Sequence, residues 1–203
     1  MRCGDVIKER RSIRKFRSKS VPFEKIMDCI DIARWVPTPS NLQNVRFIVV
    51  QDKKKIDLIA PACAGQQWIA SAPGIIVICN DPEKIIRDFD KLGKKYAEQS
   101  AAAAAMLFML AAHEQKLATC WVGAFDEKVI RRELRIPDNV IPEIVIPLGY
   151  ANESARGSRL TADLVTFFDD WDNRYMSHSG VMKNLSAGLR HKIKSINKKG
   201  NLP

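Results

Sequence analysis

Apolar positions recur along the chain with two different spacings, which divide it into expected helices and strands. Stretches with helical spacing or helix-start signals predict helices; they are residues 4–10, 22–36, 53–59, 84–116 and 126–134. Short β-branched or apolar runs, bounded by charged or turn residues, predict extended segments; they are residues 46–51, 74–80, 119–125 and 141–150. Because these elements show no regular βαβ alternation, we expect an α+β fold.

Several elements carry more specific expectations. The run over residues 74–80 is apolar throughout and predicts a strand buried on both faces. Residues 96–115 are Ala-rich and apolar nearly all round, which predicts a buried helix. Pro142 and Pro147 restrict the last strand to an edge or a bulge. The helix that starts near Pro22 is expected to bury one stripe, formed by Ile26, Met27, Ile30, Ile32 and Ala33.

The chain has 203 residues and a net charge of +10, and the charge is uneven. We expect one domain over residues 1–176 and a basic C-terminal extension over residues 177–203. The extension has Lys and Arg but no acid, and its apolar spacing predicts an amphipathic helix. It could be a solubilising end, a helix laid across a partner subunit, or a nucleic-acid contact. Since no aromatic residue interleaves with its charges, we do not expect nucleic acid as a partner.

Localisation and metal binding follow from what the sequence lacks. No run reaches the ~18 apolar residues that a membrane span needs, so no membrane partner is expected. The N-terminus has no apolar signal core, which favours the cytoplasm. The five cysteines and three histidines show neither CxxC pairs nor zinc spacing. We therefore expect reduced thiols and no metal site.

Three segments carry groups suited to one phosphorylated aromatic ligand. The first is Arg10-Arg11-Ser12-Ile13-Arg14, where guanidinium forks and a hydroxyl match phosphate oxygens. Ile13 and Phe16 predict that this segment touches the core while its basic side chains point elsewhere. The second segment is the hydroxyl- and amide-rich loop over residues 37–43, and the third is Arg156-Gly157-Ser158-Arg159. No GxGxxG motif follows a strand, so no Rossmann-type dinucleotide site is expected.

Taken in order, these motifs resemble the nitroreductase family over about residues 5–172. Its RRSxR opening is present at residues 10–14, and its Pro-Ser/Thr-x-x-Asn-x-Gln loop at residues 37–43. An Ala-Pro pair precedes the apolar strand, and an Ala-rich helix leads into the Cys-Trp-x-Gly-x-Phe-Asp segment at residues 120–126. A strand ending in Gly-Tyr follows at residues 149–150. One departure is Asn44-Val45, where the family usually has Pro-Trp beside the substrate pocket.

The resemblance implies a fold, a cofactor and an assembly. The fold is a central, mostly antiparallel sheet flanked by helices, with a long buried central helix. The cofactor is flavin mononucleotide (FMN), held at the interface of a homodimer by residues from both chains. The residues implied to bind it are Arg10, Arg11, Ser12, Arg14, Thr38, Asn41, Gln67, Val122, Gly123, Ala124 and Arg159.

These residues have different implied roles. Arg10, Ser12 and Arg159 would hold the phosphate and the ribityl end, and Arg14 would face the pyrimidine edge of the flavin. Thr38 and Asn41 would lie near the ring and the ribityl chain, with Gln67 as a further ring contact. The backbone of residues 122–124 would lie beside the ring.

The resemblance also implies an activity without a catalytic side chain. NADH or NADPH would act as a transient electron donor to the flavin, and a nitroaromatic or quinone acceptor would follow in the same place by a ping-pong scheme. The flavin carries the chemistry while Arg14 polarises it. Two alternatives stay open: other FMN chemistry, such as dehalogenation, flavin fragmentation or ring dehydrogenation, and a non-catalytic flavin-binding protein.

Overall fold

The computed structural model describes residues 2–173, and the chain divides into two units, Met1–Arg156 and Gly157–Pro203. Each unit is described by itself. The predicted boundary between residues 176 and 177 and the predicted tail helix lie outside the described residues. The helices of the first unit are α1 (Cys3–Glu9), α2 (Phe23–Ala33), α3 (Lys53–Ala62), α4 (Glu83–Phe89), α5 (Lys91–Glu114) and α6 (Glu127–Leu134).

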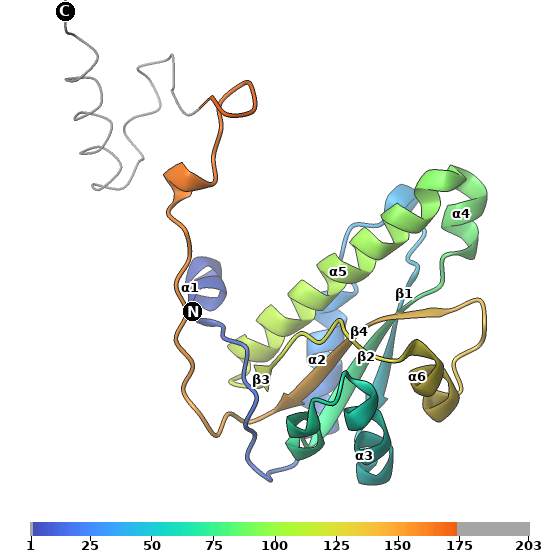
Figure 1. Ribbon diagram of the computed structural model, residues 1–203, viewed down its shortest axis with the longest axis vertical. Coiled ribbons are helices and arrows are strands. Elements are labelled where there is room, and N and C mark those ends of the chain that lie inside the picture. The colour runs from blue at the N-terminus through green and yellow to red at the C-terminus, as the bar shows by residue number, and fades with distance from the viewer. Residues whose placement is uncertain (1, 174–203) are drawn as a thin grey trace, which may run out of the picture. The chain divides into compact units, whose positions relative to one another are not determined.

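One antiparallel sheet forms the centre of the first unit, with the strand order β1-β2-β4-β3. Its strands are β1 (Val45–Val50), β2 (Gly74–Asn80), β3 (Ala118–Thr119) and β4 (Ile141–Gly149). Every residue of β2 is buried, as the continuous apolar run predicts. With helices around this sheet, the α+β prediction is confirmed (Figure 1).

The sheet separates two apolar clusters, so the unit has three layers. On one face Ile76 and Ile78 pack with α2 and α5, including the fully buried Phe108. On the other face Ile75 and Val77 pack with α3 and α6. This division follows from the alternation of side chains along a strand. It explains why β2 must be apolar at every position.

The long helical stretch is two helices in the structure. It breaks at Asp90, whose φ of 46° lies in the left-handed region. Gly93 allows the close approach of α4 and α5, because a Cβ there would lie 2.6 Å from the Cα of Ile86. The predicted all-round burial of α5 is wrong for the single chain. One face is buried, but Ala102, Met106 and Leu110 on another face are only half-buried.

The apolar stripe of α2 is also narrower than predicted. Ile26 and Ala33 are fully buried, whereas Met27 and Ile32 are 42% and 43% exposed. The buried row instead includes Cys29, which lies between the other two at helical spacing. Some apolar side chains of α2 are therefore left on the surface of the single chain.

Of the two predicted alternatives for the last strand, an edge or a bulge, the structure has the bulge. β4 lies between β2 and β3, and its register against β2 shifts beside Pro142, where Glu143 is the extra residue. The two prolines are tolerated because β3 has only two residues and pairs only with the last two of β4. Most of that side of β4 thus has no regular ladder that a missing N–H would interrupt.

The described part of the second unit, residues 157–173, is short and irregular. It contains one 3₁₀ turn, Ala162–Leu164, and a contact between Phe167 and Trp171 with ring centroids 4.5 Å apart. Across residues 2–173 no helix combines the length and the hydropathy required to cross a bilayer.

Candidate functional site

The arginine segment runs along the end of the sheet formed by β3 and the end of β4. Ser12 bridges Thr119, and the Ile13 N–H donates to the Thr119 carbonyl at 3.0 Å. Further on, Phe16 bridges Ala151. Ile13 and Phe16 are each 7% exposed, which confirms that this segment is anchored in the core. The basic side chains of Arg14, Lys15 and Arg17, next to these anchors, are exposed.

Three predicted ligand residues come together around the thiol of Cys120. Burial raises the pKa of this thiol, while the Arg14 charge, a hydrogen bond from Ser12 and the Arg10 charge all lower it. All three side chains therefore lie within electrostatic reach of one thiol, whose neighbour Thr119 is bridged by Ser12. Two nitrogens of the Arg10 guanidinium are themselves buried. Two cations and a hydroxyl thus converge at one end of the sheet, a donor set that suits a phosphate.

Arg11 is arranged differently from its neighbours. Its Nη1 donates to the carbonyls of Lys8 and Arg10 at 2.5 and 2.9 Å, at the C-terminal end of α1. In this arrangement the guanidinium satisfies helix-end carbonyls. Its predicted contact with the cofactor stays a prediction.

Arg14 lies over an aromatic side chain that the sequence did not single out as functional. The centre of its guanidinium is 5.9 Å from the Trp68 ring centroid, a cation–π geometry. The same Trp68 ring stacks with Phe16, with centroids 6.5 Å apart. These two contacts place the 3₁₀ turn that contains Trp68, Gln67–Ser71, beside the arginine segment. Gln67 directly precedes Trp68 and is exposed.

Gly123 and Ala124, two of the predicted ring contacts, are exposed beside an open cavity. Val122 is buried and bridges Val145, whereas Gly123 and Ala124 are exposed. The cavity has a volume of about 520 Å³. Its lining residues are Pro61, Ala62, Ala64, Gly123, Ala124, Phe125, Asp126 and Val129. A flat ring could approach the backbone here closely, because no side chain stands at Gly123.

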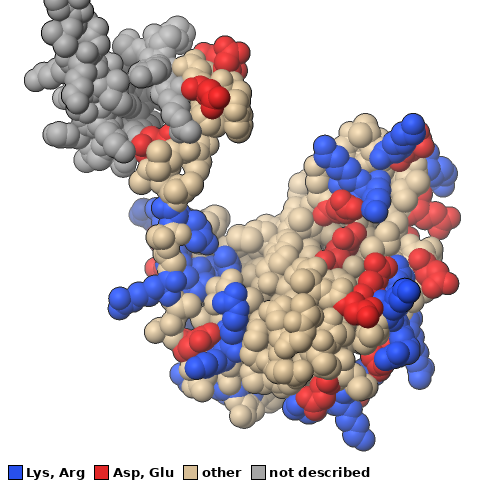
Figure 2. Space-filling model, in the orientation of Figure 1, with Lys and Arg blue, Asp and Glu red and all other residues tan. Residues whose placement is uncertain are grey.

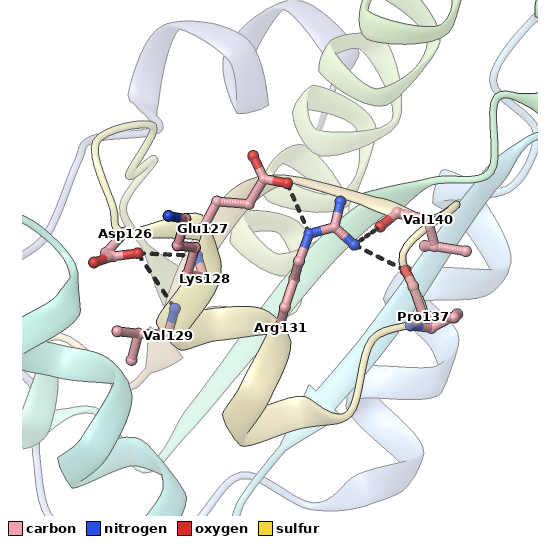
Figure 3. A network of polar contacts seen from close by, with 7 residues as sticks. All are labelled: Asp126, Glu127, Lys128, Val129, Arg131, Pro137 and Val140. Atoms are coloured by element: carbon pink, nitrogen blue, oxygen red, sulfur yellow. Dashed lines mark hydrogen bonds and ion pairs between the residues drawn. The ribbon is translucent and has the colours of Figure 1, made fainter.

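The start of α6 fixes this segment in place. The Asp126 carboxylate accepts from the N–H groups of Lys128 and Val129 at 2.9 and 3.3 Å and so caps the helix predicted from residue 126 (Figure 3). The Asp126 N–H donates to the Ala62 carbonyl at 2.8 Å and so joins the segment to α3. Arg131 then ties α6 to the loop before β4 (Figure 3).

The loop over residues 38–43 lies at the opposite end of the sheet. It leads into β1 next to Asn80, the last residue of β2, whereas the arginine segment lies near the first residue of β2 (Figure 1). A seven-residue strand is roughly 20 Å long. Within one chain, Thr38 and Asn41 are therefore not brought together with Arg10, Ser12 and Arg14.

The conformation of this loop is held at both ends. Ser40, Asn41 and Gln43 have φ values of 45°, 55° and 49°, a left-handed backbone that costs energy for residues other than glycine. The Thr38 hydroxyl accepts from the Gln43 N–H at 3.0 Å. At the other end the Asn44 carbonyl accepts from the Asp81 N–H at 2.8 Å. These contacts keep a strained loop in one shape.

Of the two residues that depart from the family pattern, Asn44 is buried. It is 2% exposed and donates its amide to the side chain of Asn80, which in turn donates to Glu143 at 3.2 Å. Val45 instead lines a cavity of about 140 Å³ together with Thr38 and Gln43. The Asn80 side-chain oxygen satisfies the Asn44 amide nitrogen, whereas the Asn44 Oδ1 is buried without a hydrogen-bond partner among the described residues.

Arg159 lies in the second unit, where it is exposed and donates from Nη1 to the Ser158 carbonyl at 2.9 Å. Its predicted contact with the phosphate stays a prediction. Sequence reasoning missed Trp68 and Glu153 as parts of the site. An isolated tryptophan or glutamate in a loop carries no signal until the fold places it against another segment.

Comparison with known proteins agrees with this arrangement. The sequence profile of the nitroreductase family matches residues 7–71 and 63–150. A protein of Methanothermobacter thermautotrophicus, provisionally named NADH dehydrogenase/NAD(P)H nitroreductase, is 34% identical over 156 residues, which cover 74% of this chain and 78% of the relative. The NAD(P)H-type FMN reductase of Bacillus subtilis is 26% identical over 216 residues, which cover 98% of this chain and 85% of that protein.

A solved structure gives the same result for the fold. The FMN-dependent nitroreductase of Clostridium difficile R20291 superposes with a TM-score of 0.71 and is 29% identical, covering 82% of this chain and 98% of that one. The family profile spans most of the first unit, including the arginine segment and the exposed residues beside the cavity. The chain belongs to the nitroreductase family.

Proposed function

We propose that this chain is an FMN-dependent oxidoreductase that passes two electrons from NADH or NADPH to a small conjugated acceptor of the nitroaromatic or quinone type. The observation that carries the proposal is the pairing of the arginine segment with Thr119, which brings Arg10, Ser12 and Arg14 beside Cys120 at one end of the sheet. Family membership and the names of the relatives support both the nicotinamide donor and the flavin.

The residues present fit FMN in their chemistry. Guanidinium groups and a hydroxyl complement the phosphate, and the backbone of the exposed residues Gly123 and Ala124 suits the edge of a planar ring. When bound, FMN supplies the two-electron chemistry. Arg14, held over Trp68, would supply a fixed positive charge that stabilises the negative charge developed by FMN on reduction. No side chain of this chain is assigned a proton-transfer step.

A homodimer would complete the site. The half-buried apolar row of α5 adjoins α2, whose Phe23 and Met27 are 54% and 42% exposed. In Figure 2 the middle of the first unit carries few charged side chains on the face in view, and the charges lie at its margins. An uncharged surface of this kind is suited to pairing with a second copy.

A dimer would also bring together two segments that lie at opposite ends of the sheet within one chain. Thr38 and Asn41 lie at the opposite end of the sheet from Arg14, so in this proposal they contact the cofactor that the partner subunit's arginine segment holds. A two-fold axis at the α5 surface would bring the loop over residues 38–43 of the partner subunit to the arginine segment of the first. Each FMN would then be held by both subunits, as the family resemblance implies.

The test starts with the visible spectrum of the purified protein, followed by rapid-mixing reduction with NADH and with NADPH. We expect bound FMN, bleaching by at least one nucleotide, and reoxidation by a nitroaromatic or a quinone. A protein that cannot be reconstituted with FMN would overturn the proposal. Bound FMN that neither nucleotide reduces would favour the other FMN chemistries.

A further inference from the structure

Glu153 makes an unusual pair of contacts for a carboxylate in a cationic region. Its Oε1 accepts from two consecutive backbone N–H groups, those of Arg14 at 2.6 Å and Lys15 at 3.1 Å. It forms no ion pair with any guanidinium or ammonium group of residues 2–173. The carboxylate therefore binds the backbone of the arginine segment rather than its charges.

Two successive N–H groups that face one acceptor form a small anion-binding concavity. In a regular extended strand, adjacent N–H groups point to opposite sides and cannot share an acceptor. The backbone at Arg14 and Lys15 thus leaves the extended path at this point. Glu153 fills the concavity with an anion of the chain's own, so this backbone is not available to an outside phosphate.

The contacts on either side show what this bend achieves. Beyond it the chain pairs again, with Asn152 N–H donating to the Lys15 carbonyl at 2.9 Å and Arg17 N–H donating to the Tyr150 carbonyl at 2.8 Å. At the bend itself, the Arg14 side chain crosses the Trp68 ring. Glu153 fixes the main chain from which this guanidinium extends.

We propose that Glu153 is a positioning residue, whose carboxylate holds the backbone of Arg14 and Lys15 so that the Arg14 guanidinium points into the cofactor site. The proposal rests on the proposed function, because it concerns the cation that would polarise FMN. Glu153 touches neither cofactor nor substrate in this account. It acts through Arg14.

An electrostatic role and a positional role of Glu153 predict opposite effects of its removal on FMN binding. A negative charge near an anion site weakens anion binding, so an electrostatic role predicts that removing it tightens FMN binding. A positional role predicts that loss of the acceptor weakens FMN binding. Glu153→Gln removes the charge but keeps a carbonyl acceptor, whereas Glu153→Ala removes both, and the pair separates the two effects.

The experiment titrates apoprotein with FMN by flavin fluorescence and measures amide hydrogen exchange at residues 13–17. We expect Glu153→Ala to weaken FMN binding about tenfold, ~1.4 kcal/mol, in the range for a hydrogen bond to a charged group. Glu153→Gln should stay within about threefold of the wild type. The Arg14 and Lys15 amides of Glu153→Ala should exchange faster without any cofactor. Asp88→Ala, an exposed carboxylate on α4, is the matched control and should change neither readout.

Several outcomes would overturn the proposal: unchanged binding and exchange in Glu153→Ala, or tighter binding in both variants. If Glu153→Ala does not fold, Glu153→Asp replaces it, since it keeps the charge but shortens the reach. The positional role then predicts weaker binding by Asp than by Gln, and the reverse order contradicts it. If the wild type binds no FMN, the proposed function fails, while amide exchange still decides whether Glu153 holds the backbone.

Discussion

Asn44 donates its side-chain amide to the side-chain oxygen of Asn80, and the two residues are 2% and 1% exposed. Asn44→Ala would leave the Asn80 acceptor buried without its donor. We expect the free energy of unfolding to fall by about 1–2 kcal/mol, as for other unsatisfied buried polar groups. Urea unfolding measures this. Asn139→Ala, in an exposed loop, is the control, and equal stability of the two variants would show that the buried pair contributes nothing.

Arg131 and Arg132 are neighbours on α6 with different tasks. Arg131 is 18% exposed and donates to Glu127 and to the carbonyls of Pro137 and Val140 (Figure 3). Arg132 is 72% exposed, and its side chain pairs with Glu133 alone among residues 2–173. Arg131→Ala should lower stability by about 1.5–3 kcal/mol. Arg132→Ala should lower it by less than ~1 kcal/mol. Thermal unfolding of both variants tests this, and similar melting temperatures would contradict it.

The sequence predicts the fold wherever one local rule decides. The continuous apolar run over residues 74–80 predicts a strand buried on both faces, and the helix-start signal at Asp126 predicts the beginning of α6. Both predictions are confirmed. Such local rules fail where the outcome depends on a neighbouring element of the fold. Pro147 favours an edge on its own, yet β4 lies inside the sheet because the two-residue β3 leaves most of that flank without a ladder.

The candidate site divides in the same way. Arginine and hydroxyl residues close in sequence, such as Arg10, Ser12 and Arg14, can be predicted to meet. The separation of Thr38 from them depends on which end of the sheet each loop occupies, and periodicity carries no information on that. Glu153 is 139 residues from Arg14 along the chain, so only the fold could reveal their contact.

The carboxyl of Glu143, which accepts a hydrogen bond from Asn80, makes the stability of the fold depend on pH. Burial is the main cause that raises the pKa of this carboxyl above its ordinary 4.5, although the hydrogen bond from Asn80 lowers it. A raised folded-state pKa contributes stability that is complete below the unfolded pKa and is lost as the pH rises through the folded pKa. Glu143→Gln avoids this loss and keeps an acceptor for Asn80.

We therefore expect Glu143→Gln to unfold at a higher denaturant concentration than the wild type at pH 7 to 8. The difference should shrink as the pH falls and vanish near pH 4, where both side chains are neutral. Denaturation midpoints across this range provide the measurement. A gain that persists unchanged at acid pH would mean that charge burial is not its cause.

Arg14 is exposed in the single chain, so Arg14→Ala should retain the fold and the melting temperature. FMN affinity should fall at least about tenfold, because a charge-assisted contact to the ring edge is lost. Arg14→Lys should recover part of it, since an ammonium keeps the charge without the planar fork. Arg87→Ala on α4 is the exposed-arginine control. Unchanged flavin content and an unchanged reduction rate in Arg14→Ala would refute its role.

The central claim is that residues at opposite ends of one sheet serve one cofactor because two subunits share each site. Arg14→Ala and Asn41→Ala subunits, co-expressed with different tags, test it most directly. Each variant alone should bind FMN poorly, but a mixed dimer contains one site with both residues intact. Random pairing should restore roughly a quarter of the wild-type sites. Purified mixed dimers with no more FMN than either variant alone would contradict a shared site.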